Sequence, residues 1–312
     1  MSSPLLAVDA PSLYFRAYHG IPESAARAPD GSPVNAVRGF LDMLATLVRT
    51  RRPGRIACAL DEDWRPAWRV ALVPSYKAHR LAPAGPPGSE VVPDGLVPQV
   101  PLILEVLDAL GVPAFGAAGY EADDVLGTLA TREPGPVEVV SGDRDLIQLV
   151  DDTKPVRLLY CGRGVAKLEV LDAAAVTDRY GVPPAGYADF ATLRGDPSDG
   201  LPGVPGVGEK TAARLVTRFG DLPALLAAVD DPQQPFAPGL RARLAGAGGY
   251  LTVARDVVQV VRDVALPDVD AAVGAGPAHP ERLMALAERH NLAGPVRRLL
   301  DALTDAATAA RR

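Results

Sequence analysis

Acidic residues recur in short groups along the chain, and their types and spacing suit the binding of divalent metal ions. The set comprises Asp9, Asp61, Glu121, Asp123, Asp124, Asp143, Asp145, Asp196 and Asp199. Carboxylates brought together in one place raise each other's pKa values unless a cation neutralises them. Ligation by oxygen alone favours Mg²⁺ or Mn²⁺ over zinc. The set therefore predicts a polyacidic site for two such ions, with a third ion left open.

Each acid also has a purely structural interpretation. A lone Asp at the end of a strand is often a turn former or a helix N-cap. The group Glu121-Ala-Asp123-Asp124 at a helix start can simply complement the helix dipole. Only the convergence of the whole set on one sheet edge favours a metal site over these alternatives.

Basic residues gather in two short segments, of which the first is Tyr76-Lys77-Ala-His-Arg80. Lys77 and Arg80 are three residues apart, so on a helix they would share one face and bind a single phosphate, with Tyr76 placed to stack on a base. The same run is also typical of a solvated surface.

The second basic segment is the glycine-rich run 203–211. A Glu between its last glycine and its lysine, with no strand before it, argues against a Walker A loop. As a hairpin between two helices it would instead expose backbone N–H groups, which bind a DNA phosphate without regard to sequence. A basic stripe is expected on the next helix, because every fourth position is cationic: Lys210, Arg214 and Arg218.

Composition indicates a folded protein of about two domains. The 312 residues are 48% hydrophobic and 22% charged, which excludes wholesale disorder. No segment is long and apolar enough for a signal peptide or a membrane span, so a cytoplasmic protein that binds no membrane is expected. The net charge of −6 argues against nucleic-acid binding unless acid and base occupy separate places, as the motifs indicate. Cys58 and Cys161 lack a metal-binding or disulfide context and are predicted to be buried.

The elements that must position these residues follow from hydrophobic patterning. Apolar runs alternate with amphipathic stretches in the first half, which predicts an α/β fold with a parallel sheet flanked by helices. Such a sheet gathers ligand-binding groups at the carboxyl ends of its strands. The expected strands are 5–8, 55–60, 112–115 and 137–140, and the expected helices are 35–48, 97–110 and one that starts at 121.

Two segments depart from this alternation. Residues 81–98 are dense in Pro and Gly and are predicted to be an exposed, mobile connection without a core element. After about residue 171 the pattern is helical, which predicts a smaller all-helical domain. Within it, 281–303 is expected to be a helix packed back on the core, with Arg297 and Arg298 facing DNA, and the tail after Asp301 is expected to be a frayed helix.

Taken together, the motifs resemble the bacterial 5′-nuclease and flap endonuclease family, which includes the N-terminal nuclease domain of DNA polymerase I. Each motif alone is weak, but they occur in the family's order, and the chain resembles a free-standing member. The matching segments are Val8–His19, Leu60-Asp61, Tyr76–Arg80, Gly119–Asp124, Ser141–Leu149 and Gly195–Ala212.

The resemblance implies a PIN-like nuclease core over residues 1–175, with an arch at about 66–98. It implies a helical DNA-binding domain over 176–312, with a helix–three-turn–helix motif at about 189–218. One metal ion would be held by Asp9, Asp61, Glu121 and Asp123, and the other by Asp143, Asp145, Asp196 and Asp199, with Asp123 and Asp124 able to bridge them. Mg²⁺ or Mn²⁺ would fill these sites, and K⁺ would bind the 203–208 turn.

The same resemblance implies roles for the basic and glycine-rich residues. Lys77 and Arg80 would contact the scissile phosphate at the base of the arch, with Tyr76 near the unpaired nucleotide. Further DNA contacts are expected from Arg16, Tyr18, Gly203, Gly206, Gly208, Lys210, Thr211 and Arg214. Because the arch segment holds fewer basic residues than is typical of the family, we expect it to be disordered without DNA.

The implied activity is that of a structure-specific 5′-nuclease, acting as flap endonuclease and 5′-3′ exonuclease in replication and repair. Its substrates would be DNA with 5′ flaps, nicks or 5′ ends, and RNA primers. It would act as a monomer in the bacterial nucleoid, alongside a repair DNA polymerase and a ligase. Two alternatives stay open: a catalytically inactive protein that binds forked DNA, and a PIN-type ribonuclease.

Overall fold

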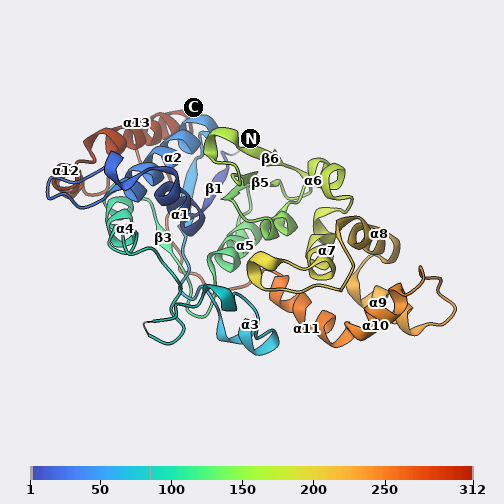
Figure 1. Ribbon diagram of the computed structural model, residues 1–312. Coiled ribbons are helices and arrows are strands. Elements are labelled where there is room, and N and C mark those ends of the chain that lie inside the picture. Colours follow the sequence, from blue (N-terminus) through green and yellow to red (C-terminus); the bar gives the residue numbers. More distant parts are fainter. Residues whose placement is uncertain (1–2, 85, 311–312) are drawn as a thin grey trace.

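The chain folds around a six-stranded sheet in the order β3-β2-β1-β4-β5-β6, which is parallel except for β6 (Figure 1). The computed structural model describes residues 3–84 and 86–310. The predicted α/β class is confirmed, and the predicted strands are present with small changes at their ends. The fifth and sixth strands were not predicted. The strands are β1 (Leu5–Asp9), β2 (Arg55–Ala59), β3 (Ala114–Phe115), β4 (Val137–Ser141), β5 (Val156–Tyr160) and β6 (Glu169–Leu171).

Alternating side chains of the strands supply two hydrophobic cores, one on each face of the sheet. Leu6 and Val8 of β1 belong to one core, and Leu5 and Ala7 belong to the other. The first face is covered by α1 (Ala10–Gly20), α2 (Asn35–Arg51), α4 (Gln99–Leu110), α12 (Pro280–Arg289) and α13 (Ala293–Ala310). The second face is covered by α5 (Ala122–Arg132) and by the helices that follow the sheet in sequence.

The helical part lies beside the sheet on the side of α5 (Figure 1). It comprises α6 (Ala173–Tyr180), α7 (Tyr187–Arg194), α8 (Glu209–Phe219), α9 (Leu222–Asp230), α10 (Leu240–Gly246) and α11 (Gly248–Val258). The small helix α3 (Ala67–Leu72) contacts α11 from the first half of the chain. Within the described residues, no helix is long and apolar enough to cross a membrane. Both cysteines are free and buried, as predicted.

The C-terminal segment corrects two expectations. Instead of one helix over 281–303, α12 and α13 are separated by a break at residues 290–292. The tail after Asp301 is not frayed, because Leu303 and Ala306 are buried against the core that contains α2. Alanines at helical spacing give α13 a small apolar face that allows close packing. Arg298 forms an ion pair with Asp42 on α2.

The segment 81–98 contains no helix or strand among its described residues. Its first part folds back on itself, since the Ala82 amide donates to the Ser89 carbonyl and the Val91 amide to the Arg80 carbonyl, each at 2.8 Å. The expectation that it adds nothing to the core is wrong for Leu96, whose side chain is completely buried. Disorder of this arch segment without DNA stays a prediction.

Candidate active site

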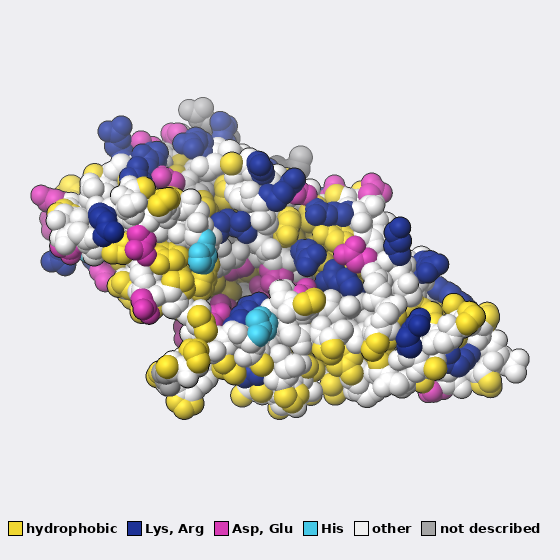
Figure 2. Space-filling view, viewed as in Figure 1, with side chains coloured by type: hydrophobic (Ala, Val, Ile, Leu, Met, Phe, Trp, Pro, Cys, Tyr) yellow, Lys and Arg dark blue, Asp and Glu magenta, His cyan; other side chains and the backbone are white. Residues whose placement is uncertain are grey.

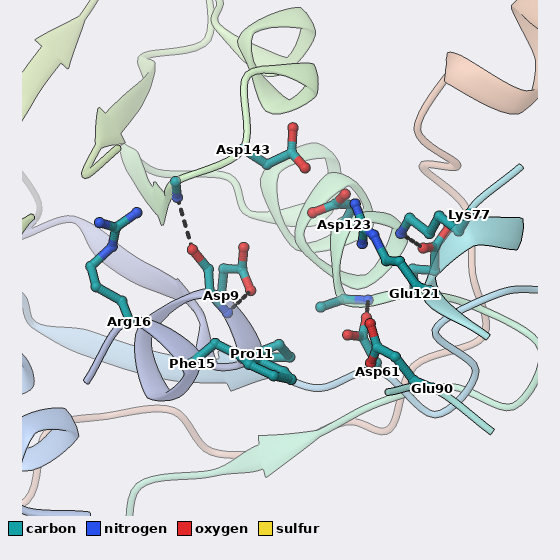
Figure 3. A pocket seen from close by; sticks show the side chains of 14 residues that line it. Asp9, Pro11, Phe15, Arg16, Asp61, Lys77, Glu90, Glu121, Asp123 and Asp143 are labelled. Carbon is teal, nitrogen blue, oxygen red and sulfur yellow. Dashed lines mark hydrogen bonds and ion pairs between the residues drawn. The ribbon is translucent and has the colours of Figure 1, made fainter. Parts of the chain in front are cut away.

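The acidic residues meet at the point where the strand order reverses. Strands β2 and β3 extend from β1 in one direction and β4 and β5 in the other, so the sheet has its topological switch point between β1 and β4. A cleft of about 340 Å³ opens there, beyond the carboxyl ends of these strands. Its charged lining residues include Asp9, Arg16, Asp61, Lys77, Arg80, Glu121, Asp123 and Asp143 (Figure 3).

Asp9 shows that the structural and functional interpretations of a strand-end Asp are compatible. Its Oδ1 accepts the Ser12 amide at 2.9 Å and thereby caps α1, while its Oδ2 accepts the Ser141 hydroxyl at 2.5 Å. Burial raises the pKa of Asp9 to about 7, although both hydrogen bonds favour the charged form. The nearby Asp61 and Asp143 raise it further. Both of these hydrogen-bond donors are uncharged, and no salt bridge to Asp9 is formed within the described residues.

Asp123 and Asp143 face the same cleft from different elements (Figure 3). Asp123 lies in the first turn of α5, and Asp143 follows β4. Burial raises the pKa of Asp123 well above its usual value, and the charges of Asp143 and Asp9 add to this effect. Asp61 is oriented by the Ala122 amide, which donates to its Oδ1 at 2.7 Å.

Asp145, Asp196 and Asp199 form a second acidic group, joined electrostatically to the first through Asp143. Burial and the charges of Asp143, Asp199 and Asp196 raise the pKa of Asp145 well above its usual value. The buried Oδ1 of Asp145 has no hydrogen-bond partner within the described residues. Asp196 pairs with Arg194 at 3.3 Å, and Asp199 with Arg80 at 2.8 Å.

Asp124 is paired with an arginine and does not line the cleft, so the structure gives no support to the prediction that it could bridge two metal ions. It is completely buried, and both of its oxygens accept hydrogen bonds from the Arg69 guanidinium, at 2.7 and 2.8 Å. Its Oδ2 also accepts the Glu121 amide at 3.2 Å, which is the helix-start role proposed as the alternative. The neighbours Asp123 and Asp124 thus point to different environments from the same turn of α5.

Lys77 and Arg80 line the cleft, but not from one face of a helix as predicted. Lys77 adopts a left-handed conformation with φ of 48°, and only a short 3-10 turn, Ala78–Arg80, follows it. The Lys77 ammonium pairs with Glu121. The Tyr76 ring is buried and its hydroxyl donates to Glu121 Oε2 at 2.7 Å, so in this structure it does not present a face for base stacking. Its place near an unpaired nucleotide stays a prediction.

Two further DNA contacts were predicted in the first half of the chain, and the structure places only one of these residues, Arg16, at the cleft. Arg16 lines the cleft, and its buried Nε has no hydrogen-bond partner within the described residues. Tyr18 is not among the cleft residues, and its hydroxyl donates to Glu23 at 2.6 Å.

Sequence reasoning missed Glu90, which lines the cleft beside Asp61 (Figure 3). It also missed the buried Arg69. The only sequence signal for Arg69 was its place just before the basic run.

The carboxylates are not arranged as a ready-made metal cage. Among residues 3–84 and 86–310, no three His, Cys, Asp or Glu side chains are placed to hold a metal ion together. Glu121 is engaged by three donors, from Arg69, Tyr76 and Lys77. The cleft and the neighbouring acidic group nevertheless contain several carboxylate oxygens. Desolvation and neighbouring acids raise the pKa values of Asp9, Asp123 and Asp145, so a bound cation would stabilise their charged forms.

The glycine-rich run forms a turn between α7 and α8, so its predicted local geometry is present. Gly203 has a φ of +66°, and a Cβ there would lie 2.5 Å from backbone atoms of Arg194, so only glycine fits. Gly208 immediately precedes α8, and the turn at Gly206 and Gly208 is exposed. In Figure 2, acidic side chains lie in the central hollow, with Lys and Arg around it and along the helical part. The exposed cations of α8 line a groove of about 710 Å³: Lys210, Arg214 and Arg218.

Comparison with known proteins identifies the class. The family described as "5'-3' exonuclease, N-terminal resolvase-like domain" matches residues 4–181, and "5'-3' exonuclease, C-terminal SAM fold" matches residues 182–279. Together they cover the acidic cleft and the glycine-rich turn, which places the chain among the nucleases. The chain belongs to the 5'-3' exonuclease family.

Individual relatives agree. A 5'-3' exonuclease of Streptomyces coelicolor is 58% identical over 96% of this chain and 100% of its own length. One of Mycobacterium tuberculosis is 53% identical over 97% of this chain and 98% of its own. DNA polymerase I of Mycobacterium tuberculosis is 42% identical over 84% of this chain, a match that spans 28% of that polymerase.

Solved structures share the fold at low sequence identity. The T5 D15 protein co-crystallised with metal ions has a TM-score of 0.61 at 16% identity and covers 97% of this chain, with 99% of that protein matched. The catalytic core of Rad2 in complex with DNA substrate has a TM-score of 0.59 at 17% identity, over 98% of this chain and 93% of that one.

Proposed function

We propose that this protein is a structure-specific 5′-nuclease that hydrolyses DNA phosphodiesters at 5′ flaps, nicks and 5′ ends with the help of divalent metal ions. The observation that carries this proposal is the cleft at the switch point, where Lys77 and Arg80 lie beside several acids and desolvation raises the pKa values of Asp9 and Asp123. The relatives named as 5'-3' exonucleases support the direction of cleavage. The Rad2 structure with DNA substrate supports DNA as the ligand.

The donor set fits divalent metal ions. A bound cation would lower the pKa values of three acids that are raised here, Asp9, Asp123 and Asp145. It would also give a partner to Asp145 Oδ1, which has none within the described residues. Carboxylate oxygens suit Mg²⁺ or Mn²⁺. We assign one ion to Asp9, Asp61, Glu121 and Asp123, and a second to Asp143, Asp145, Asp196 and Asp199. When bound, such ions activate the attacking water and neutralise charge on the leaving 3′-oxygen.

Lys77 and Arg80, together with Arg16, supply positive charge to the cleft. Lys77 is held at the cleft by an ion pair with Glu121, and Arg80 by an ion pair with Asp199. A DNA phosphate entering the cleft would meet both cations at the edge of the acidic groups. Donors held in place before the reaction stabilise the charge that develops on the phosphate.

The helical part would hold the duplex. The exposed turn at Gly206 and Gly208 precedes a helix N-terminus, where backbone N–H groups bind phosphate without reading bases. The carbonyls of the 203–208 turn would hold K⁺. This assignment divides the chain into a nuclease core, to which α12 and α13 also belong by packing, and a DNA-binding helical part. RNA primers would be a second class of substrate. A repair polymerase would act before this nuclease, and a ligase after it.

Cleavage assays on labelled oligonucleotides test this function against its two rivals. The wild type is incubated with a 5′-flap duplex, a nicked duplex and a single-stranded RNA, each with Mg²⁺, Mn²⁺ or EDTA. We expect cutting of the DNA substrates near the junction or nick with either metal, and none in EDTA. A protein that binds the flap but cuts nothing would be a forked-DNA-binding protein, and preferential cutting of RNA would indicate a ribonuclease.

A further inference from the structure

Arg69 is a buried arginine on α3 whose guanidinium binds two other segments, so that it links three parts of the chain. Only 3% of its surface is exposed. Nη1 and Nη2 bind the Asp124 carboxylate in a bidentate manner at 2.8 and 2.7 Å, and Nη1 also contacts Glu121. The third nitrogen, Nε, donates to the Val257 carbonyl at 3.1 Å. The planar fork of an arginine is needed to satisfy these partners at once.

The three segments have different tasks in the proposed function. Arg69 itself lies on α3, a few residues before Lys77. Glu121 and Asp124 start α5, and Glu121 in turn accepts hydrogen bonds from Lys77 and Tyr76. Removal of Arg69 would therefore leave Glu121 held only from the arch side of the cleft.

The third segment, α11, connects Arg69 to the glycine-rich turn. Val257 is in its last turn, and Tyr250 is near its beginning. The Tyr250 hydroxyl accepts the Gly203 amide at 3.2 Å, and Arg255 binds Asp189 of α7 at 2.7 Å. Helix α11 thus contacts the DNA-binding turn with one end and Arg69 with the other.

We propose that Arg69 is a positioning residue that fixes Glu121 and Lys77 relative to α11, so that the distance from the duplex-binding turn to the cut site is set by one rigid helix. This inference rests on the proposed function and deepens it by assigning the register of cleavage. A buried ion network that only stabilises the fold is the competing explanation. The two differ in whether the position of the cut changes.

The test compares Arg69→Lys with a matched control, Arg51→Lys. Arg51 pairs with Glu138, and this pair is not among the cleft residues. We expect Arg69→Lys to lower kcat on a 5′-flap substrate by about 10- to 100-fold, with KM changed less than about threefold. On a sequencing gel the cuts should spread over adjacent phosphates. Arg51→Lys should cut as the wild type does.

A binding measurement keeps the test independent of cleavage. Mn²⁺ titrated into the DNA-free proteins and followed by electron paramagnetic resonance should bind Arg69→Lys about tenfold more weakly than wild type. If the wild type does not cut at all, the proposed function fails, while this titration still tests whether Arg69 positions Glu121. Wild-type Mn²⁺ affinity together with an unchanged cut site would overturn the inference.

Tyr250→Phe covers the case in which Arg69→Lys does not fold. It removes the contact of α11 with the Gly203 amide at the far end of the helix. We expect cuts spread over neighbouring phosphates with unchanged Mn²⁺ affinity. A single cut position, identical to that of the wild type, would contradict the role of α11.

Discussion

The acidic cleft and the glycine-rich turn differ in the solvent exposure of their polar groups. In the cleft, Asp9 is buried and Asp123 is partly buried, and desolvation together with the charges of nearby acids raises both pKa values. In the turn, Gly206 and Gly208 offer exposed backbone, and the cations of α8 lie on the surface. Burial makes charge effective for chemistry because the local dielectric is low. Exposure suits a reversible, sequence-independent grip on a phosphate backbone, since charge there is screened by salt. Substitutions in the cleft should therefore affect kcat, and substitutions at the turn should affect binding.

Asp143→Asn should produce the largest effect, because Asp143 joins the two acidic groups. Removing its charge should lower kcat on a flap substrate on the order of 1,000-fold, the equivalent of several kcal/mol of transition-state stabilisation. DNA binding, measured by fluorescence anisotropy in Ca²⁺ or EDTA, should change less than about threefold. A parallel loss of binding would erase the distinction between the two regions.

Lys77→Ala should come next, with kcat about 100-fold lower. Its ammonium lies at the cleft, paired with Glu121, and under the proposed function its charge also acts on the reacting phosphate. Single-turnover cleavage at saturating enzyme isolates the chemical step. The matched control is Lys154→Ala, whose lysine donates to the Thr131 carbonyl and is not among the cleft residues. Equal losses in both variants would show that Lys77 has no special role.

The double variant Lys210→Ala/Arg214→Ala should weaken duplex binding about tenfold while leaving single-turnover kcat at saturation unchanged. Both side chains are exposed on α8 next to the turn. The slope of log Kd against log salt should fall by roughly two, about one for each lost phosphate contact. A salt slope equal to that of the wild type would mean that the duplex does not pass along α8.

The sequence predicted the features that depend on local pattern. It did not predict features that depend on contacts between distant segments of the chain. Asp9, Asp61 and Asp143 follow apolar strands, so both their type and their placement were readable, whereas Glu90 lies in an irregular segment and was missed. Strand β5 was not predicted, since its run Val-Arg-Leu-Leu-Tyr is short and interrupted by a charge, and β6 has only three residues. Burial of Tyr76 and the pairing of Asp124 with Arg69 arise from packing across 45 and 55 positions of the chain, which no spacing rule encodes.

The smallest expected effect is a pH dependence of stability that the cleft shows and the turn does not. In the unfolded chain Asp9 ionises near its ordinary pKa of 3.8, whereas burial raises its pKa to about 7 in the metal-free fold. Between these values the folded state holds the extra proton, so stability should fall as pH rises from about 4 to 7 and stay low above 7. The raised pKa values of Asp123 and Asp145 act in the same direction.

Thermal unfolding in EDTA should show a Tm lower by a few degrees at pH 7.5 than at pH 5.5. Asp9→Asn should flatten this dependence, and Mg²⁺ should reverse it because metal binding favours the ionised carboxylates. A Tm in EDTA that rises over this pH range would contradict a cleft short of positive charge.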